Sequence, residues 1–255
     1  MADHTSTLSV HGLSTPKIIG AAFRMARQVH PELKGKYLDI GSGNGELIAL
    51  MRQNFPVEAA ACDYTAELMQ IPGQKVDVVD LNTESLPYES NSFDLITFTE
   101  VIEHIEHDRH IIREIYRILK PGGAVIITTP NILNIKSRLR FLFFGFYTLF
   151  GPLLVRDSRK YSSGGHINPI SYFYLCHALL DAHFKDLRSG IDKKQKSGIP
   201  PLILLWVPIK VRAWFIHRRE LSRYGTIDEN NEAIVRKMNS AELLLGRTLV
   251  VAATK

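Results

Sequence analysis

The stretch from Leu38 to Gly45 constrains the fold more than any other part of this sequence. It reads Leu-Asp-Ile-Gly-Ser-Gly-Asn-Gly, an apolar strand followed by a loop with glycine at every second position. Such a loop lets the backbone approach a ligand where any Cβ would clash. A glycine-rich loop by itself is weak evidence, because it occurs at many strand-to-helix turns.

Two later features strengthen the interpretation. Asp63 closes the next apolar run, residues 57–62, and a further run begins Phe93-Asp94-Leu95-Ile96. The ordered set indicates a nucleoside-type cofactor site at the ends of parallel strands, which short apolar runs with helical or turn crossovers predict. The expected strands are 37–40, 57–62, 76–79, 93–98, 124–128, 183–190 and 247–253, and the expected helices are 18–29 and 110–119.

In this order the motifs resemble those of the class I S-adenosylmethionine-dependent methyltransferases, in particular the ubiquinone-biosynthesis O-methyltransferase and methyltransferase type 11 group. The resemblance covers residues 35–130 and is thinner beyond them. It implies an α/β fold with a seven-stranded doubly wound sheet, mostly parallel with the last strand antiparallel, and helices on both faces. The matching segments are Leu38–Gly45, Asp63, Val79–Leu81, Phe93–Ile96, Leu119–Gly123, Thr129–Asn131 and Gly165–Pro169.

The resemblance also implies S-adenosylmethionine as the cofactor. Asp39 would fix the glycine loop, Asp63 would accept hydrogen bonds from the ribose hydroxyls, and Asp80 would read the adenine amine. The alternative for both later acids is a helix cap or a turn acid. A dinucleotide fits less well, because the glycines here lack the Gly-x-Gly-x-x-Gly spacing. The expected cofactor residues are Asp39, Gly41, Gly43, Gly45, Asp63, Tyr64, Asp80, Leu81 and Thr99.

Activation of the methyl acceptor is expected to depend on the segment Thr99-Glu100-Val101-Ile102-Glu103-His104. If a helix starts here, Glu100, Glu103 and His104 project from one face. With His166 they would suit a divalent cation, Mg²⁺ by the oxygen ligands or Mn²⁺ or Zn²⁺ by the histidines. The pattern resembles the ubiquinone-biosynthesis O-methyltransferases and the small-RNA 2′-O-methyltransferases.

A metal-free site and a structural histidine are the alternatives to the cation. In the metal-free site His104 is a general base and Glu100 contacts the cofactor. His104 and Glu100 are thus the expected catalytic residues under either functional interpretation.

The length of 255 residues suits a single class I methyltransferase domain. Its expected parts are a cofactor-binding core at 30–133, an insertion between strands five and six with a substrate or membrane role at 134–223, and a final strand region at 224–255. Cys62 and Cys176 match no metal or redox spacing, which predicts buried reduced thiols. The first 30 residues show no secretory signal, so a cytoplasmic location is expected.

Charge is unevenly distributed along the chain. Residues 1–133 hold 11 Lys and Arg against 17 Asp and Glu, whereas residues 134–223 hold 16 against 5. The basic part contains an apolar stretch, Phe141 to Val155, with three cations on each side, and a second one, Ile199 to Ile209, that includes Trp206. Apolar segments with aromatic residues and a cationic rim predict peripheral contact with an anionic membrane surface. A pocket lid and a dimer contact are the alternatives, and the oligomeric state is left open.

These features together predict an S-adenosylmethionine-dependent O-methyltransferase. Its acceptor would be a hydroxyl of a lipid-linked or amphiphilic small molecule, such as a quinone precursor or a lipid-linked sugar. An RNA 2′-O-methyltransferase is the first alternative, since the basic block suits a polyanion. Nucleic acid fits the clustered apolar side chains less well. The second alternative is a non-enzymatic cofactor-binding protein associated with a membrane.

Overall fold

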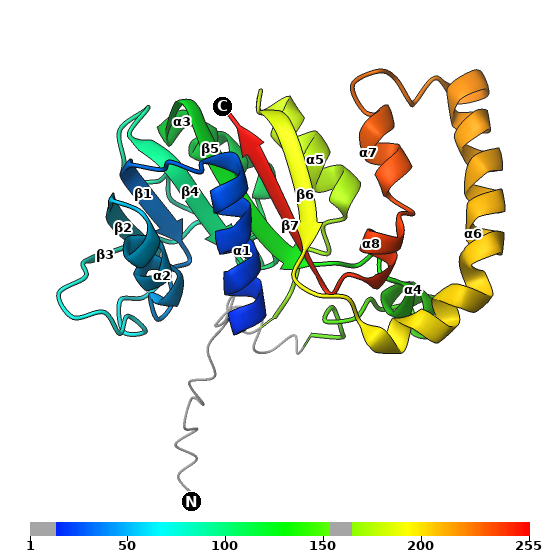
Figure 1. The fold of residues 1–255 in the computed structure, drawn as a ribbon, viewed down its shortest axis with the longest axis horizontal. Helices are drawn as coiled ribbons and strands as arrows, with labels where there is room; N and C mark the ends of the chain where they lie inside the picture. Colours follow the sequence, from blue (N-terminus) through cyan, green and yellow to red (C-terminus); the bar gives the residue numbers. More distant parts are fainter. Residues whose placement is uncertain (1–13, 154–164) are drawn as a thin grey trace, which may run out of the picture.

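The computed structural model describes residues 14–153 and 165–255 and shows one twisted sheet between layers of helices (Figure 1). The elements, in chain order, are α1 (Pro16–Val29), β1 (Gly35–Ile40), α2 (Glu46–Asn54), β2 (Val57–Asp63), β3 (Val76–Val78), β4 (Phe93–Thr99), the 3₁₀ turn η1 (Ile102–His104), α3 (Asp108–Ile118), β5 (Leu119–Pro130), α4 (Ile135–Phe144), α5 (Tyr172–Asp181), β6 (Lys185–Ile191), η3 (Lys196–Gly198), α6 (Ile199–Arg219), the π turn η4 (Glu220–Tyr224), α7 (Glu232–Lys237), α8 (Ala241–Leu245) and β7 (Thr248–Thr254).

The sheet has seven strands in the order β3-β2-β1-β4-β5-β7-β6. The pairings β1–β2, β1–β4, β2–β3 and β4–β5 are parallel, and β7 runs antiparallel to both β5 and β6. The predicted doubly wound sheet with an antiparallel last strand is therefore confirmed. Because the chain crosses back between β1 and β4, the carboxyl ends of these strands flank a switch point where α/β sheets bind ligands.

Alternation along the strands supplies a core on each face of the sheet. In β1, Tyr37 packs toward α1 and α2, whereas Leu38 and Ile40 pack toward α3 and α5. All three side chains are fully buried, as expected for a central strand covered on both faces. Cys62 and Cys176 are buried and unpaired thiols, as their spacing predicted.

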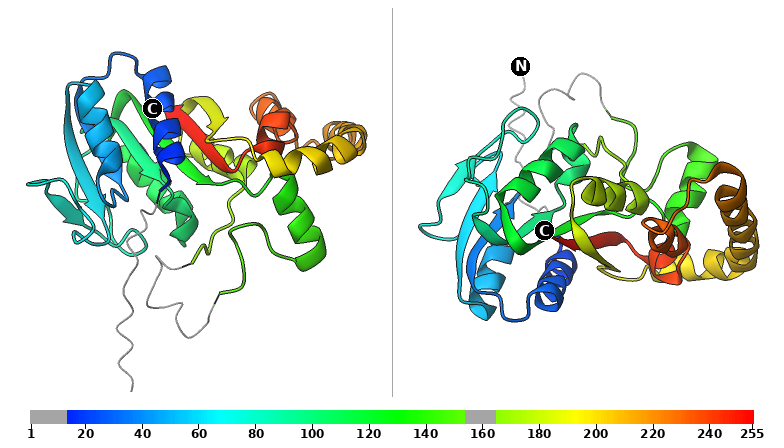
Figure 2. Two further views of the ribbon diagram at one scale, coloured as in Figure 1. Left: turned by 60° about the horizontal axis from the view of Figure 1, so that its bottom comes forward. Right: turned by 90° about the horizontal axis from the view of Figure 1, so that it is seen from above.

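A third, smaller hydrophobic cluster holds α4, α6 and α8 together beside the sheet. Its buried members are Ile135, Leu202, Leu244 and Leu245. Figure 2 shows these helices at the end of the molecule opposite β3. This cluster joins the two helices that carry the apolar stretches singled out in the sequence. Ile135 is the first residue of α4, and Leu202 lies in the first turns of α6.

The predicted insertion is divided in a way that its composition does not reveal. β6 occupies residues 185–191, within the region 134–223 that was expected to lie wholly between strands five and six. The second apolar stretch therefore lies between β6 and β7, as part of the 21-residue helix α6. The first one forms the last turn of α4 and an irregular segment; its final residues and three of its flanking cations lie outside the described residues.

Strand β5 also begins earlier than the apolar run predicted. It starts at Leu119, which pairs with Phe93, and the register shifts before Leu95 pairs with Ala124. The Pro121-Gly122-Gly123 turn is thus an irregularity within the strand instead of a break before it. The ion pair between Lys120 Nζ and Asp94 Oδ2, at 2.7 Å, fixes this early pairing.

Candidate active site

A cavity of about 340 Å³ opens at the carboxyl ends of β1, β2 and β4. Its wall combines the glycine loop, the start of α1, the turns after β2 and β3, and the segment after β4. The residues that line the cavity include Asp39, Gly41, Gly43, Asp63, Tyr64, Asp80, Leu81, Thr99, Glu100, Val101, Glu103, His104, Leu149, His166 and Arg247. The sequence motifs therefore meet in one place, although they are spread along the chain from Asp39 to His166.

Two glycines of the loop have different physical reasons for being there. Gly41 has a φ of +74°, and a Cβ on it would lie 2.1 Å from Cγ2 of Val101. Gly43 has a φ of +50°, but a Cβ there would meet no described atom within 4 Å. The first glycine is thus needed for packing within the protein, whereas the second keeps open space beside the cavity.

Asp63 holds the glycine loop in position. Its carboxylate accepts hydrogen bonds from the backbone N–H of Gly43 at 2.8 Å and of Tyr64 at 2.7 Å. Burial raises the pKa of Asp63, and these amide donors oppose the rise. Held this way at the end of β2, the acid is placed to accept further hydrogen bonds from a ligand in the cavity.

Asp39 lies beneath the loop and is engaged on another side. It accepts a hydrogen bond from Thr97 Oγ1 at 2.6 Å, and Thr97 in turn contacts the hydroxyl of Tyr37 at 2.7 Å. Burial raises the pKa of Asp39 to about 7. The loop amide of Gly43 binds Asp63 instead, so the loop-fixing role expected for Asp39 falls to Asp63.

Asp80 and Leu81 follow β3 on the adenine side that the resemblance implies. The carboxylate of Asp80 accepts from the backbone N–H of Asn82 and from the hydroxyl of Thr83, both at 3.0 Å. Asp80 is therefore a turn acid that also faces the cavity. Thr99 is buried at the end of β4, and its hydroxyl has no hydrogen-bond partner among the described residues.

Glu100 departs from the helical spacing that the sequence predicted. It has a φ of +56° and precedes η1, so it does not share a helical face with Glu103 and His104. Its carboxylate accepts a hydrogen bond from Thr128 Oγ1 at 2.9 Å. Burial raises the pKa of Glu100 to about 7. The reason for the departure is tertiary, because Glu100 is fixed by β5.

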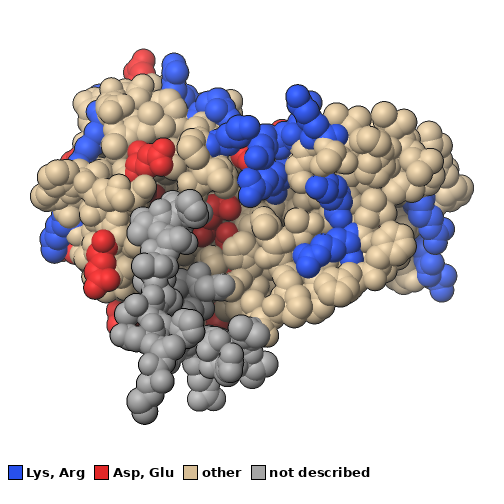
Figure 3. All heavy atoms as spheres, turned by 90° about the horizontal axis from the view of Figure 1, so that it is seen from below, with Lys and Arg blue, Asp and Glu red and all other residues tan. Residues whose placement is uncertain are grey.

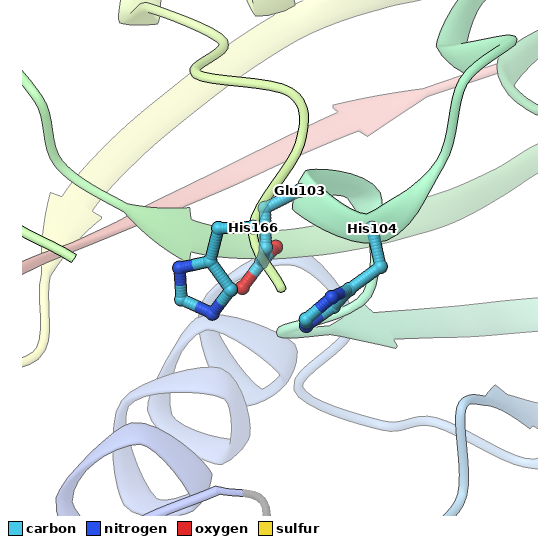
Figure 4. A group of neighbouring side chains, drawn as sticks. All are labelled: Glu103, His104 and His166. Carbon is cyan, nitrogen blue, oxygen red and sulfur yellow. The ribbon is translucent and has the colours of Figure 1, made fainter. Parts of the chain in front are cut away.

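The other three predicted ligands converge. Atoms of Glu103, His104 and His166 lie within 4.8 Å of one another, and Figure 4 shows the carboxylate of Glu103 between the two rings. The insert folds back onto η1 because Ile167 and Asn168 donate their backbone N–H groups to the carbonyl oxygen of Glu103, at 2.9 and 3.0 Å. Glu100 is not part of this group, so the four-ligand set reduces to three residues.

The protonation of this group follows from its surroundings. Nδ1 of His104 lies 2.9 Å from the carbonyl oxygen of Gly165, which only accepts, so Nδ1 carries the proton in the neutral ring. Burial, and after it the neighbouring His104, lower the pKa of His166 to about 4, so His166 is a neutral imidazole near pH 7. Burial raises the pKa of Glu103 well above its ordinary value, and Glu100 adds to the rise.

One part of the cavity wall, Arg247, had no signal in the sequence. Two other parts lie in segments that were predicted, namely Leu149 in the apolar stretch with the pocket lid as an alternative and the start of α1 beside the expected helix 18–29. Leu149 lies in the irregular segment after α4, and Arg247 is the residue immediately before β7. The start of α1 contributes Thr15 and Ile18. The helix over residues 18–29 was predicted, but the arginine was expected only as part of a strand. A lone basic residue at a strand start gives no spacing that would link it to a site more than 140 residues earlier.

A family model for a methyltransferase domain matches residues 21–189. The chain belongs to the class I S-adenosylmethionine-dependent methyltransferases. The model spans the cofactor motifs and the segment that carries His166, so the family match covers most of the cavity wall.

Curated relatives of this methyltransferase match over about half its length. A ubiquinone/menaquinone biosynthesis C-methyltransferase UbiE from Desulfotalea psychrophila is 30% identical over 137 residues, which is 50% of this chain and 56% of the relative. A demethylmenaquinone methyltransferase from Lactiplantibacillus plantarum is 30% identical over 149 residues, 53% of this chain and 63% of the relative. The chain thus spans only part of these relatives.

Solved structures agree with the fold of the methyltransferase. An S-adenosylmethionine-dependent methyltransferase from Archaeoglobus fulgidus superposes with a TM-score of 0.57 at 17% identity, covering 93% of this chain and 94% of that one. Phosphoethanolamine N-methyltransferase 2 from Haemonchus contortus, solved with S-adenosyl-L-methionine, gives 0.52 at 18% identity, covering 92% and 52%. At these identities the likeness concerns the fold alone.

Proposed function

We propose that this methyltransferase transfers a methyl group to a hydroxyl oxygen of an amphiphilic or lipid-linked small molecule, at the cytoplasmic face of a membrane. The observation that carries the oxygen acceptor is the orientation of His104 at the cavity wall. Its Nδ1–H is held by the carbonyl of Gly165, so its Nε2 is the basic nitrogen of the neutral ring. A base of this kind suits an acceptor whose proton must be removed as it attacks.

The cofactor fits the cavity on two observations. A Cβ at Gly43 would occupy open space beside the cavity, and Asp63 is already preorganised by two amide hydrogen bonds. Gly41, Gly43, Asp63 and Asp80 would hold S-adenosylmethionine there. When bound, it would supply a methyl group on a sulfonium centre, and a nucleophile would attack that methyl carbon in line with its bond to sulfur, which breaks.

The residues of the chain then have separate tasks. Asp63 keeps the glycine loop in the conformation that leaves room for the cofactor. His104 accepts the proton of the acceptor hydroxyl, and the Gly165 carbonyl keeps its ring oriented and stabilises the charge that develops on it. The wall from Leu149 and the rings of His104 and His166 separates the reacting groups from water, because the segment at 165–168 covers this side of the cavity.

A divalent cation is an alternative way to activate the same hydroxyl. Both carboxylate oxygens of Glu103 and Nδ1 of His166 are buried without a hydrogen-bond partner among the described residues. A neutral imidazole and a buried carboxylate are ligand types that Mn²⁺ and Zn²⁺ accept, whereas Mg²⁺ prefers oxygen alone. Glu103, His104 and His166 would hold the ion, which would lower the pKa of a bound acceptor hydroxyl.

Methylation of carbon is the second candidate reaction. It is supported by the names of the curated relatives, which describe C-methyltransferases of ubiquinone and menaquinone biosynthesis. A quinone precursor ring with a free hydroxyl would also use His104, because loss of the hydroxyl proton makes the neighbouring ring carbon nucleophilic. The site is therefore compatible with methyl transfer to either the hydroxyl oxygen or the neighbouring ring carbon, and the product must be identified directly.

The deciding experiment measures transfer from labelled S-adenosylmethionine to lipid and RNA fractions of a cell extract, each tested separately. We expect label in the lipid fraction, and nuclear magnetic resonance of the product to show an O-methyl group. A methylated ring carbon would replace this reaction with the second candidate. Label in RNA alone would refute the amphiphilic acceptor, and no label in any fraction would favour a non-enzymatic role.

Two variants separate the base from the cation. If His104 acts as the base, His104→Gln lowers the rate by roughly 10² to 10⁴ while chelators leave the wild type active. If a cation is used, chelators and Glu103→Gln abolish turnover with little change in S-adenosylhomocysteine affinity. The matched control is His107→Gln, an exposed histidine three residues along the same segment, which should keep wild-type activity.

A further inference from the structure

The outer face of α6 is an apolar surface that the described chain leaves uncovered. Among the described residues, one helical segment, Lys196–Tyr224, has the length and composition of a membrane span, and little of it is buried. The inner face of α6 packs through Leu202 onto the third cluster. The outward row recurs at helical spacing and consists of Ile203, Leu204, Val207, Val211, Trp214 and Phe215.

The last turn of α4 extends this surface. Phe141, Leu142, Phe143 and Phe144 are all exposed, and the side chain of Phe143 is 81% accessible to solvent. α4 and α6 lie side by side in both views of Figure 2, and Lys136 of α4 donates to Ser197 Oγ at 3.1 Å. Exposed apolar side chains gathered on neighbouring helices mark an interaction surface on a protein. We call the outward row of α6 and residues 141–144 the apolar face.

The charges on α6 itself are of one sign. α6 contains Lys210, Arg212, Arg218 and Arg219 and no acidic residue. On the face shown in Figure 3, the end formed by α4 and α6 shows lysines and arginines, whereas the rest of the face carries side chains of both signs. A protein partner of mixed charge has no particular match here, but a negatively charged lipid surface has.

Aromatic rings and cations are paired along the helix. Lys210 Nζ lies 4.5 Å from the ring centroid of Trp206, and the guanidinium of Arg218 lies 4.7 Å from that of Trp214. Tryptophan rings with adjacent cations suit the boundary between headgroups and acyl chains, where the ring and the charge are both well solvated.

The attachments of α6 decide against a helix that crosses the bilayer. Lys210, in the middle of the helix, donates to the backbone carbonyl of Asn239 at 2.9 Å. Arg138 of α4 binds the side chain of the same residue at 2.7 Å and the carbonyl of Met238 at 3.0 Å. A spanning helix would have to break these ties and bury Lys210 and Arg212 in hydrocarbon.

We propose that the apolar face docks into one leaflet of an anionic bilayer, with α6 lying parallel to the membrane plane. The outward row and residues 141–144 enter the acyl boundary, and Arg212, Arg218 and Arg219 contact phosphate groups. This extends the proposed function by giving the amphiphilic acceptor a physical source.

The apolar face also continues toward the cavity. Leu149 follows α4 by five residues, is partly exposed, and lines the cavity. Leu153 packs closely on Gly165, because a Cβ built on that glycine would lie 2.7 Å from Cδ2 of Leu153. The carbonyl oxygen of Gly165 in turn contacts Nδ1 of His104. An acyl-linked acceptor leaving the bilayer at α4 therefore meets apolar side chains up to the candidate base.

The two tryptophans of the chain, Trp206 and Trp214, are both in α6. Tryptophan fluorescence, excited at a wavelength that tyrosine does not absorb, therefore reports on this helix alone. The full-length protein is titrated with vesicles of phosphatidylcholine alone and with vesicles that contain 30% phosphatidylglycerol. We expect a blue shift with the anionic vesicles, at least tenfold weaker binding to the neutral ones, and weaker binding as salt rises. Lipids brominated near the headgroup end of the chain should quench more than lipids brominated near the methyl end.

Charge introduced into the apolar face should abolish docking. Leu204 is 77% exposed, so Leu204→Glu is expected to fold normally and to weaken vesicle binding at least tenfold. The matched control is Tyr174→Glu at a 63% exposed position on α5, which should bind within twofold of the wild type. Unchanged S-adenosylhomocysteine affinity in both variants establishes that they are folded.

Four results would overturn the proposal. They are absence of a blue shift with anionic vesicles at low salt, wild-type binding by Leu204→Glu, strongest quenching from the methyl end of the chains, and a dimer in solution that Leu204→Glu converts to a monomer. None of these measurements requires turnover. Failure of docking is therefore distinguishable from failure of the proposed methyl transfer.

Discussion

Replacing Gly41 by alanine tests whether the loop glycines serve packing or ligand binding. Alanine at a φ of +74° costs about 1–2 kcal/mol because of its left-handed backbone. Its Cβ would also lie 2.1 Å from Cγ2 of Val101, and overpacking of this kind costs about 1–3 kcal/mol more. We therefore expect Gly41→Ala to lower the free energy of unfolding by about 2–5 kcal/mol.

Gly43→Ala is the matched control, because it shares the backbone strain without the collision. A Cβ there meets nothing within 4 Å, so the stability loss should stay near the backbone cost of about 1–2 kcal/mol. Its effect should instead fall on ligand binding, since the methyl group would enter the space beside the cavity. Urea unfolding of the ligand-free protein and titration calorimetry with S-adenosylhomocysteine measure the two quantities separately.

Val101→Ala completes the test by removing the colliding methyl groups. In the Gly41→Ala background it should recover the steric part, so the two changes together cost about 1–3 kcal/mol less than the sum of the single changes. Equal stability losses at Gly41 and Gly43 would refute the assignment. Additivity of Gly41→Ala and Val101→Ala within about 0.5 kcal/mol would refute it as well.

Three further outcomes follow from buried polar groups. Asp63→Ala should weaken S-adenosylhomocysteine binding by about 1.5–3 kcal/mol in calorimetry, because it removes a charged acceptor and releases Gly43. The folded chain keeps the proton of Asp39 up to a pKa of about 7, whereas the unfolded chain releases it near 3.8, so the free energy of unfolding should fall with rising pH across that window by up to about 4 kcal/mol. Urea melts of Asp39→Asn between pH 5 and 8 should show a shallower slope, because Glu100 with its raised pKa still contributes, and an unchanged slope would assign the whole of it to other groups. Arg138→Met should cost about 2–4 kcal/mol, because it removes the donor to three half-buried oxygens, the backbone carbonyls of Leu133 and Met238 and the side-chain oxygen of Asn239.

The cofactor half of the fold is predictable because its signals are local. Each strand of the sheet from β1 to β4 is a short apolar run, and each functional acid or glycine stands directly after one. The carboxyl ends of parallel strands share an edge, so the order of motifs is enough to bring Gly41, Asp63 and Asp80 around one cavity. No long-range contact has to be known for this prediction.

The position of Glu100 shows where such reasoning ends. Its spacing to Glu103 and His104 is helical, but its conformation is set by Thr128 on β5, 28 residues later. The backbone N–H and the carboxylate of Glu100 both bind the Thr128 hydroxyl, which holds the residue at a positive φ. A pairing between strands decides this conformation, and sequence spacing carries no trace of it.

The division of the basic region has a similar cause. β6 has an exposed and partly exposed pattern because it is the edge strand of the sheet. Its strand was expected at 183–190 and is present at 185–191, but the basic composition of residues 134–223 grouped it with the segments on either side, so the region was expected as one insertion. In the chain, α4 precedes β6 and α6 follows it, but both helices lie at the same end of the molecule. The antiparallel pairing of β6 with β7 is what shows this arrangement.

The energetics of Glu103 argue against a purely structural role for the histidine pair. Its side chain is completely buried, and neither carboxylate oxygen meets hydrogen-bond geometry with a described residue, although the nearby Thr129 hydroxyl offsets part of the burial. A buried polar group without a partner destabilises a fold by about 1–3 kcal/mol, and a charged one by more. A site that served only to order the loop would gain stability from an apolar residue at this position. The neutral imidazole of His166 and the ring of His104 beside such a carboxylate, at the edge of the cofactor cavity, are instead what a proton acceptor or a metal ligand set requires before its ligand arrives.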